Sequence, residues 1–182
     1  MVEGLDSAQA WRQRWSLFFA ATASYGAFTA ATADDEAKKY DGRVRAITST
    51  LGLLDTIIKA PPHLQAYRDH HAIDRDAPDA LARARRNARD LAKAEQSRVG
   101  WRGRVGSLIV NGAAYHFIAE EDGRHDAAFR TALTGMLVNE IKLWTFPRTM
   151  SESNVISIGQ AAVRVETNVY LTANGIGAHV RF

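Results

Sequence analysis

The sequence contains no cysteine in its 182 residues. This absence excludes a disulfide framework, a thiol nucleophile and any zinc or iron–sulfur site that cysteine would ligate. The chain also lacks a glycine-rich phosphate loop, a Walker pattern, a G-x-S-x-G elbow and a paired-carboxylate motif. No catalytic residue and no cofactor are indicated, so the sequence favours a protein without enzymatic activity.

An excess of charge of one sign is also missing. The net charge is +3, hydrophobic residues make up 46% of the chain and charged residues 24%. These are the values of an ordinary folded protein, and so small a charge does not by itself indicate a nucleic-acid partner. The length allows one sizeable core, and we interpret residues 1–182 as a single domain.

The first long apolar segment covers residues 16–33, which carry no charge and follow Arg12 and Arg14. An uncharged stretch of this length is typical of a membrane span, of the apolar part of a signal peptide or of a buried helix. Ala31-Thr32-Ala33 fits a small-x-small cleavage site. We favour the membrane span, although Ala, Ser and Thr are only mildly apolar.

Three further helices are predicted, over residues 44–59, 105–119 and 127–146. The first and last of these are amphipathic, with broad apolar faces formed by Ile47, Leu51, Leu54, Ile57 and Ile58, and by Leu133, Met136, Leu137, Ile141, Leu143 and Trp144. Their polar faces are formed by Thr48, Gly52, Asp55, Thr56 and Lys59, and by Thr131, Gly135, Asn139 and Lys142. We expect Asn139 and Lys142 to face outwards, although polar faces can also meet inside a bundle or line a cavity.

The layout of residues 33–61 returns in residues 119–147. Each segment begins with an alanine and three acidic residues, continues to an arginine and ends at a proline. The sequence therefore predicts a mainly α fold with two related helical hairpins, at 15–62 and 105–147, in a four-helix arrangement. A basic helical linker at 63–104 joins them.

The chain ends in a different pattern. Apolar and polar residues alternate in 163–171 and again after Asn174-Gly175, which is a hairpin turn signal. Residues 155–182 are therefore predicted to form a β-hairpin. An isolated hairpin is marginally stable, so it must pack on the helices or pair with another copy of the chain.

The linker carries nine arginines, one lysine and six acidic residues. Its segment 83–89, RARRNAR, can contact phosphate, but no aromatic residue interleaves with it, which disfavours nucleic acid. Membrane lipid fits better, with headgroup contacts predicted for Arg98, Trp101, Arg102 and Arg104. A cytoplasmic linker with both acidic turns outside also satisfies the positive-inside rule, which predicts the inner membrane.

Glu140 falls within the apolar arc of its predicted helix. A buried carboxylate needs a partner, and Asn111, His116 and Lys142 are the candidates. The favoured interpretation is a core glutamate that fixes how two helices pack. The alternative is a binding site in a polar pocket, formed by Glu140, Asn111, His116 and Trp144.

Histidines follow the double proline at 61–62. His63, His70 and His71 lie near Asp69, Asp74 and Asp76. Such residues can bind a divalent metal, but their spacing matches no established zinc pattern. We interpret this segment as a solvated polar loop and predict no metal site.

Residues 92–147 combine a basic helix, a tryptophan-containing entry, a helix with a central asparagine and a helix with a Glu…Trp-Thr-x-Pro ending. This pattern resembles a group of uncharacterised proteobacterial proteins. Its positions are occupied here by Asn111, Glu140, Trp144, Thr145 and Pro147. Members of that group often follow an export signal, so the resemblance implies helical hairpins and a location in the bacterial cell envelope, but no activity.

Three functions stay open at this point. The favoured one is a membrane- or envelope-associated protein with a structural or interaction role, whose partners are membrane lipid or further copies of itself. The second is a small-ligand-binding protein or enzyme with a polar pocket between the hairpins. The third is a soluble helical oligomer, assembled through the C-terminal hairpin, for which a cytoplasmic location is the alternative to the envelope.

Overall fold

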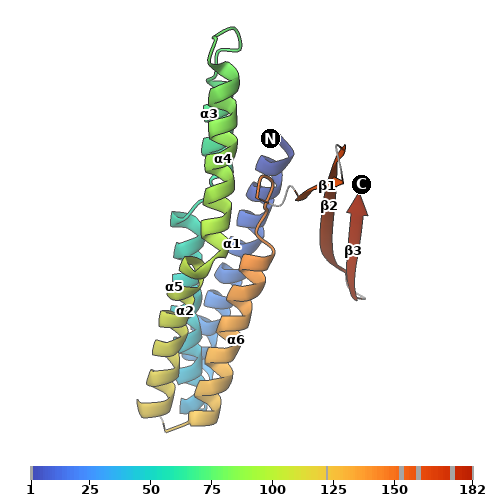
Figure 1. Ribbon diagram of the computed structural model, residues 1–182. Helices are drawn as coiled ribbons and strands as arrows, with labels where there is room; N and C mark the ends of the chain where they lie inside the picture. Colours follow the sequence, from blue (N-terminus) through green and yellow to red (C-terminus); the bar gives the residue numbers. More distant parts are fainter. Residues whose placement is uncertain (1, 122, 152–153, 159–160, 173–174, 182) are drawn as a thin grey trace.

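The structure is a computed structural model that describes residues 2–121, 123–151, 154–158, 161–172 and 175–181. Four long helices lie side by side: α1 (Val2–Thr32), α2 (Glu36–Ile58), α5 (Trp101–His116) and α6 (His125–Trp144) (Figure 1). A π-helical turn, η1 (Phe117–Glu121), ends α5. The mainly α prediction is confirmed.

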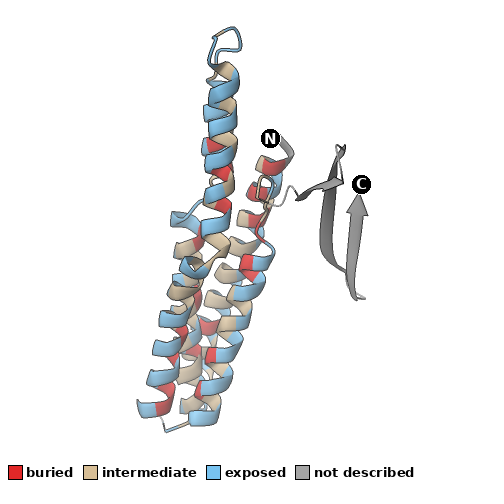
Figure 2. Ribbon diagram, viewed as in Figure 1, coloured by how far each residue is buried: buried red, intermediate tan, exposed pale blue. Residues whose placement is uncertain are grey.

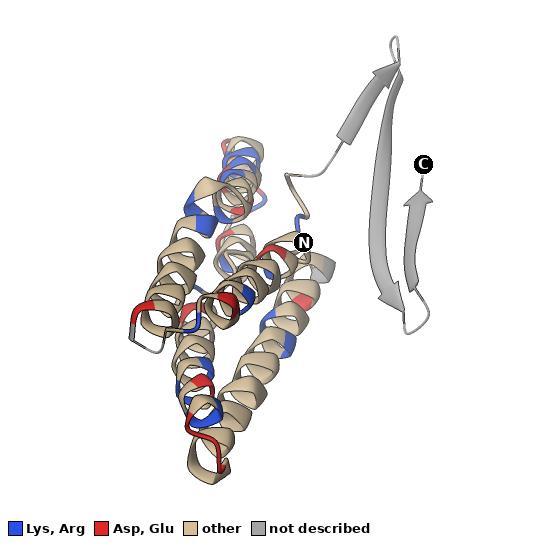
Figure 3. Cartoon of the chain, turned by 90° about the horizontal axis from the view of Figure 1, so that it is seen from below, with Lys and Arg blue, Asp and Glu red and all other residues tan. Residues whose placement is uncertain are grey.

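Two shorter helices, α3 (His63–His71) and α4 (Ala80–Val99), occupy the predicted linker. They extend beyond the long helices at the end opposite the α5–α6 turn (Figure 1). Acidic and basic residues both occur along the helices (Figure 3). Gly100 separates α4 from α5, so α5 begins at Trp101 rather than at the predicted residue 105.

Three strands follow the helices: β1 (Asn154–Ile158), β2 (Ala161–Thr172) and β3 (Gly175–Arg181). They are antiparallel in the order β1-β2-β3, with Asn154 opposite Val165 and Thr172 opposite Gly175. The predicted turn at Asn174-Gly175 begins outside the described residues, and the predicted hairpin stays a prediction.

Helices α1 and α2 begin earlier than the sequence patterns predicted. The prediction placed α1 at residue 16, but the helix starts at Val2 and buries Ala8 and Trp11. Helix α2 starts at Glu36 rather than residue 44, because the side chain of Asp35 caps it by accepting a hydrogen bond from the Lys38 amide at 3.1 Å. Apolar periodicity alone therefore does not predict where these two helices begin.

The predicted membrane span over residues 16–33 is wrong. Among the described residues, no helix combines the length and the apolar character that crossing a membrane requires. The stretch is uncharged, but its alanines, serines and threonines are too weakly apolar to substitute for leucine or isoleucine. The expected inner-membrane lipid contacts lose this support, while the envelope location stays a prediction.

Helices α1 and α2 approach each other at backbone contact. A Cβ atom on Gly26 would lie 2.6 Å from the Ala46 amide nitrogen, and one on Gly42 would lie 2.6 Å from the Ala30 amide nitrogen. Gly26 of α1 therefore packs against Ala46 of α2, and Gly42 of α2 packs against Ala30 of α1. Glycine allows this close approach because it has no Cβ atom to separate the backbones. Ser49 and Thr56 continue the buried stripe of α2.

The two hairpins meet each other mainly near their ends. At the turn end, Ile118, Ala119 and Ala128 form a small apolar cluster against Tyr40 and Val44. At the other end, the Trp11 ring packs edge-on against Phe146, with centroids 5.0 Å apart. Between these contacts the interior is not filled by apolar side chains, which makes room for the pocket described below.

Most residues on the apolar faces of α2 and α6 are exposed, contrary to the ordinary arrangement, although Leu143 is buried and Leu51 lines the space between the hairpins. Exposed fractions are 61% for Ile47, 76% for Ile58 and 55% for Leu137. Buried positions instead follow narrow inner stripes along the helices (Figure 2). The polar faces that the sequence placed outside are consequently turned toward the space between the hairpins.

Candidate functional site: a pocket between the hairpins

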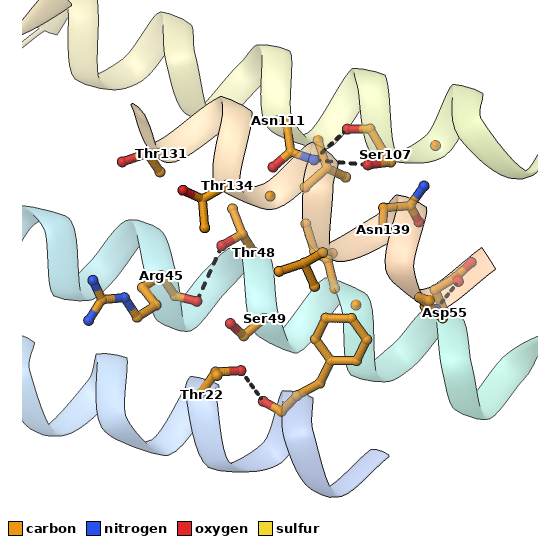
Figure 4. Close-up of a pocket in the computed structure, with 18 of the residues that line it drawn as sticks. Thr22, Arg45, Thr48, Ser49, Asp55, Ser107, Asn111, Thr131, Thr134 and Asn139 are labelled. Atoms are coloured by element: carbon orange, nitrogen blue, oxygen red, sulfur yellow. Dashed lines mark hydrogen bonds and ion pairs between the residues drawn. The ribbon is translucent and has the colours of Figure 1, made fainter. Parts of the chain in front are cut away.

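A cavity of about 530 Å³ lies between the α1–α2 hairpin and the α5–α6 hairpin. All four long helices contribute to its wall, and Figure 4 shows side chains from several helices turned toward it. The volume lies in the range typical of small-molecule sites. It is therefore the best-formed candidate site in the described part of the chain.

The polar faces of α2 and α6 both contribute to the lining, beside apolar residues such as Phe18 and Phe19 of α1. Thr48, Gly52 and Lys59 of α2 line it, as do Thr131, Gly135 and Lys142 of α6. Both triplets have the same spacing, a threonine, a glycine four residues on and a lysine seven further. The sequence therefore contained both polar faces, but helical periodicity does not predict that the face of α2 and the face of α6 lie opposite each other.

An ion pair closes the pocket at the end near the Trp11–Phe146 contact. Lys142 Nζ lies 2.8 Å from Asp55 Oδ2, and Lys59 Nζ lies 2.5 Å from Asp55 Oδ1. The predicted pairing of Asp55 with Lys59 is confirmed. Lys142 is only 4% exposed, so the expectation that it faces outwards is wrong. Its stem and amine reach inwards because Asp55 and the Phe19 ring, 5.2 Å away, receive the charge.

Burial and pairing act on both partners of this ion pair. Burial lowers the pKa of Lys142, and the hydrogen bond with Asp55 only partly offsets that effect. Burial opposes ionisation of Asp55, but the hydrogen bonds and charges of Lys142 and Lys59 outweigh it and hold the pKa of Asp55 below its usual value. The carboxylate is therefore charged and already occupied by protein cations.

A second ion pair joins the hairpins at the turn end. The guanidinium of Arg124 contacts Asp41 at 2.7 Å and 3.2 Å, and it also donates to the Ala37 carbonyl at 3.4 Å. The Tyr40 hydroxyl donates to the Phe117 carbonyl nearby, at 3.1 Å. Asp41 lines the pocket, so both carboxylates of the lining are neutralised by the protein itself.

Two cations of the lining are not neutralised in this way. Arg45 of α2 has its guanidinium 5.2 Å from the centre of the Tyr25 ring and forms no ion pair with any residue that the structure describes. Arg130 of α6 forms neither an ion pair nor a hydrogen bond within the same described part of the chain. Both side chains are exposed to solvent.

Several neutral polar groups of the lining also lack protein partners. Across the described residues, the side chains of Ser49, Thr131, Thr134 and Asn139 form no hydrogen bond. By contrast, Thr48 donates to the Val44 carbonyl at 2.9 Å, as helical threonines often do. The pocket thus offers donors and acceptors that the fold does not use.

Asn111 is the predicted binding residue that the structure places in this pocket. Its amide donates to the Ser107 carbonyl at 2.8 Å and to the Ser107 hydroxyl at 3.0 Å. Its Oδ1 lies so close to Gly135 that a Cβ there would sit 1.7 Å away. Asn111 therefore positions α5 against α6, and Gly135 is required for that approach.

Glu140 joins α6 to α5 at the surface rather than in the core. Its partner is Arg104, which was not among the predicted partners. Its carboxylate takes two hydrogen bonds from Arg104, at 2.7 Å and 2.8 Å, and its side chain is 48% exposed. The expectation of a buried glutamate is wrong, because the apolar arc that contains it faces out. The paired carboxylate raises the pKa of Arg104.

His116 and Trp144 do not line the pocket. His116 is exposed, and Trp144 is 59% exposed. Trp144 lines a separate hollow of about 340 Å³ together with Glu140 and Arg104. Of the four predicted binding residues, Asn111 lines the pocket, Glu140 and Trp144 line the hollow, and His116 lines neither.

The four residues predicted to contact lipid headgroups also differ in their surroundings. Arg98 donates to the carbonyls of Lys59 and Ala60, and its guanidinium lies 5.3 Å from the Phe146 ring. Burial lowers the pKa of Arg98. With Arg104 held by Glu140, Trp101 and Arg102 are the exposed members of the set.

Sequence reasoning missed a buried carboxylate, Glu95 of α4. Its side chain is fully buried and accepts hydrogen bonds from the amides of Thr149, Met150 and Ser151 and from the Thr149 hydroxyl, at 2.8–3.0 Å. His63 Nε2 lies 3.1 Å from Oε1. A lone glutamate in a charged, Arg-rich helix gives no sequence signal of such a role.

The histidines lie in different surroundings. Within the described ranges no group of three metal-ligating side chains converges. His63 is buried beside Glu95, whereas His70 and His71 are exposed on α3. The solvated-loop interpretation therefore fails for His63 and for residues 63–71, which are helical, whereas residues 72–79 form no helix.

Comparison with protein-family models, with curated proteins and with solved structures found no match to this chain. The functional argument therefore rests on the geometry of the pocket.

Proposed function

We propose that this protein binds a small organic molecule in the pocket between its two helical hairpins. The observation that carries the proposal is the reversed polarity of the bundle. Side chains such as Ser49, Thr131 and Asn139 line a cavity of about 530 Å³ without protein partners, while large apolar residues of the same helices lie outside. Ser49 is buried, so its hydroxyl needs a ligand or water as a partner, whereas Thr131 and Asn139 are partly buried and present unused donors and acceptors to the same space.

The way in which the hairpins meet supports a binding role. Each hairpin is tightly built, since α1 and α2 touch at Gly26 and Gly42 and since Asn111 meets Gly135 between α5 and α6. The hairpins are joined by ion pairs near the two ends of the pocket, Asp55–Lys142 and Asp41–Arg124. Two stiff units joined at their ends can separate slightly to admit a ligand, whereas a continuous apolar core could not.

Matched tryptophan substitutions test the proposal. Val110 lines the pocket, and Ile109 beside it is 66% exposed on the outside. We expect a library of small organic acids, amides and alcohols to contain compounds that raise the melting temperature of the full chain. Val110→Trp should abolish those shifts by filling the cavity, and Ile109→Trp should leave them unchanged. A saturating ligand at a hundred times its Kd stabilises the folded state by about 2.7 kcal/mol.

Two outcomes count against the proposal. One is that no compound shifts the melting temperature while Val110→Trp raises it, because a water-filled structural cavity would behave in that way. The other is that Val110→Trp and Ile109→Trp reduce binding equally. Either result would show that the pocket is not the functional site.

A second candidate function is self-association through the outer stripe of α2. Ile47, Leu54 and Ile58 are 61%, 45% and 76% exposed and share one helix face. Contiguous apolar surface of this kind commonly marks an interface, and a second copy can cover it isologously without any further partner. Light scattering should then give a dimer mass that Ile47→Glu with Leu54→Glu reduces to a monomer mass. A dimer that persists in this variant and disappears after truncation at Asn154 would instead assign assembly to the C-terminal strands.

A further inference from the structure

The charge of the pocket lining is unbalanced. Its two carboxylates, Asp41 and Asp55, are paired with Arg124 and with Lys59 and Lys142. Arg45 and Arg130 have no carboxylate partner among the residues that the structure describes. The lining therefore carries two arginines without a carboxylate partner, in addition to the two lysines that share the single carboxylate of Asp55.

The surroundings of these arginines suit an anion. The Arg45 guanidinium is held over the Tyr25 ring, which limits its orientation and leaves its N–H groups free to donate. Arg130 directly precedes Thr131 on α6, so both occur on the same turn. Both guanidinium groups are exposed to solvent, and a dissolved anion can reach them without prior unfolding.

Neutral donors line the same pocket as the arginines. In Figure 4, Thr131 and Thr134 lie toward the end of the pocket where Arg45 is found, and Asp55 lies toward the other end. The hydroxyls of Ser49, Thr131 and Thr134 make no hydrogen bond within the described residues. A hydroxyl can turn its proton toward an anion, so these groups and the arginines form one set of donors.

We infer that the ligand of this pocket is an organic oxyanion, a carboxylate or a phosphate ester, carried on a short apolar body. The anionic group is held by Arg45 and Arg130, whose planar forks match oxyanions through two parallel hydrogen bonds. The apolar body lies along Phe19, Leu51, Val110 and Val138, which line the same cavity. This inference rests on the proposed ligand-binding function and adds the chemical class of the ligand.

Titration calorimetry of the full chain with compounds of one chain length tests the inference. The set is hexanoate, hexyl phosphate, hexanamide and hexylammonium, which share the apolar body and differ in charge. We expect at least one of the two anions to bind roughly tenfold more tightly than the amide, since charge-assisted hydrogen bonds are about twice as strong as neutral ones. The stronger of the two anions identifies the headgroup.

Paired arginine variants show where the anion binds. Arg45→Gln with Arg130→Gln should remove the preference for the anion and leave the weaker amide binding unchanged. Arg85→Gln with Arg86→Gln, two exposed arginines of α4 that do not line the pocket, should change neither. Both pairs remove the same charge, so a general electrostatic effect would weaken binding in both.

The possible failures can be told apart. Equal affinities for the anion, amide and ammonium, or an anion preference that survives in the pocket variant, would overturn the inference while leaving the binding function standing. If no compound binds and Val110→Trp alters only stability, both the inference and the proposed function fail.

Discussion

The buried carboxylate of Glu95 is predicted to hold the chain after α6 against α4. Its two oxygens accept hydrogen bonds from three consecutive amides, of Thr149, Met150 and Ser151, and from the Thr149 hydroxyl. The nearby His63 ring, at 3.1 Å, adds to these contacts. Burial opposes ionisation of Glu95, but these hydrogen bonds outweigh it and lower its pKa to about 2.

The lowered pKa gives the size and the pH range of the effect. The change from 4.5 to about 2 corresponds to about 3 kcal/mol of folding free energy, since one pKa unit is worth 1.36 kcal/mol. Because the pKa is lower in the folded state, this stabilisation is fully present above the unfolded pKa of 4.5. It is lost as the pH falls from there through about 2.

Glu95→Gln tests this account because it keeps the shape of the side chain. Its amide oxygen can still accept hydrogen bonds, but its NH2 group cannot, so either the Thr149 donors or the Met150 and Ser151 amides lose their partner. We expect a loss of about 2–4 kcal/mol at neutral pH, because each buried unsatisfied donor costs about 1–3 kcal/mol. Urea unfolding followed by circular dichroism measures the loss.

Glu140→Gln provides the matched control. It makes the same change at a half-exposed ion pair, which should cost less than about 1 kcal/mol. The Glu95 variant should also lose the part of the acid dependence between pH 4.5 and 2 that Glu95 contributes, while the part from Asp55 remains, and trypsin should cut more rapidly after Arg148. Equal losses in the two variants, with the acid dependence unchanged, would refute the reasoning.

Three further predictions follow from contacts described above. Gly26→Ala should destabilise the protein by about 1–3 kcal/mol, because the new Cβ would clash with the backbone of α2. Gly112→Ala should be neutral or stabilise by up to about 1 kcal/mol, because its Cβ would meet no atom within 4 Å. Thermal unfolding of the two variants distinguishes these effects. Lys142→Ala should cost about 1–3 kcal/mol in urea unfolding, because it leaves the half-buried Asp55 carboxylate with Lys59 as its remaining partner. A cost no larger than that of the exposed Lys93→Ala would argue against the interior pair. Glu140→Leu and Glu140→Ala should both stay within about 1 kcal/mol of the native protein, since this glutamate is half-exposed; a large loss in either variant would restore a core role.

The positions of the helices could largely be predicted from sequence. Apolar periodicity placed α6 within two residues of its observed bounds, and the proline pair at 61–62 correctly predicted the end of α2. Local chemistry of this kind is decided by neighbours in the chain. The early start of α1 was not predictable in this way, because it depends on Trp11 packing against Phe146, which is far away in sequence.

Part of the candidate site could be recognised from the sequence. The polar faces containing Thr48 and Thr131 were recognised, as was the pairing of Asp55 with Lys59. A helical pattern separates two faces but does not say which one is inside, because that depends on what packs against the helix. The rule that apolar faces turn inwards therefore gave the wrong side for Lys142 and placed Glu140 in the core.

The sequence by itself determined a mainly helical chain, the amphipathic character of α2 and α6 and the absence of any cysteine chemistry. Tertiary structure alone decided that the polar faces meet across a cavity, that Glu95 is buried under the chain after α6, and that Arg45 and Arg130 line one pocket. The physical reason is that helix formation depends on residues three and four apart, whereas charge pairing and burial depend on residues that only folding brings together.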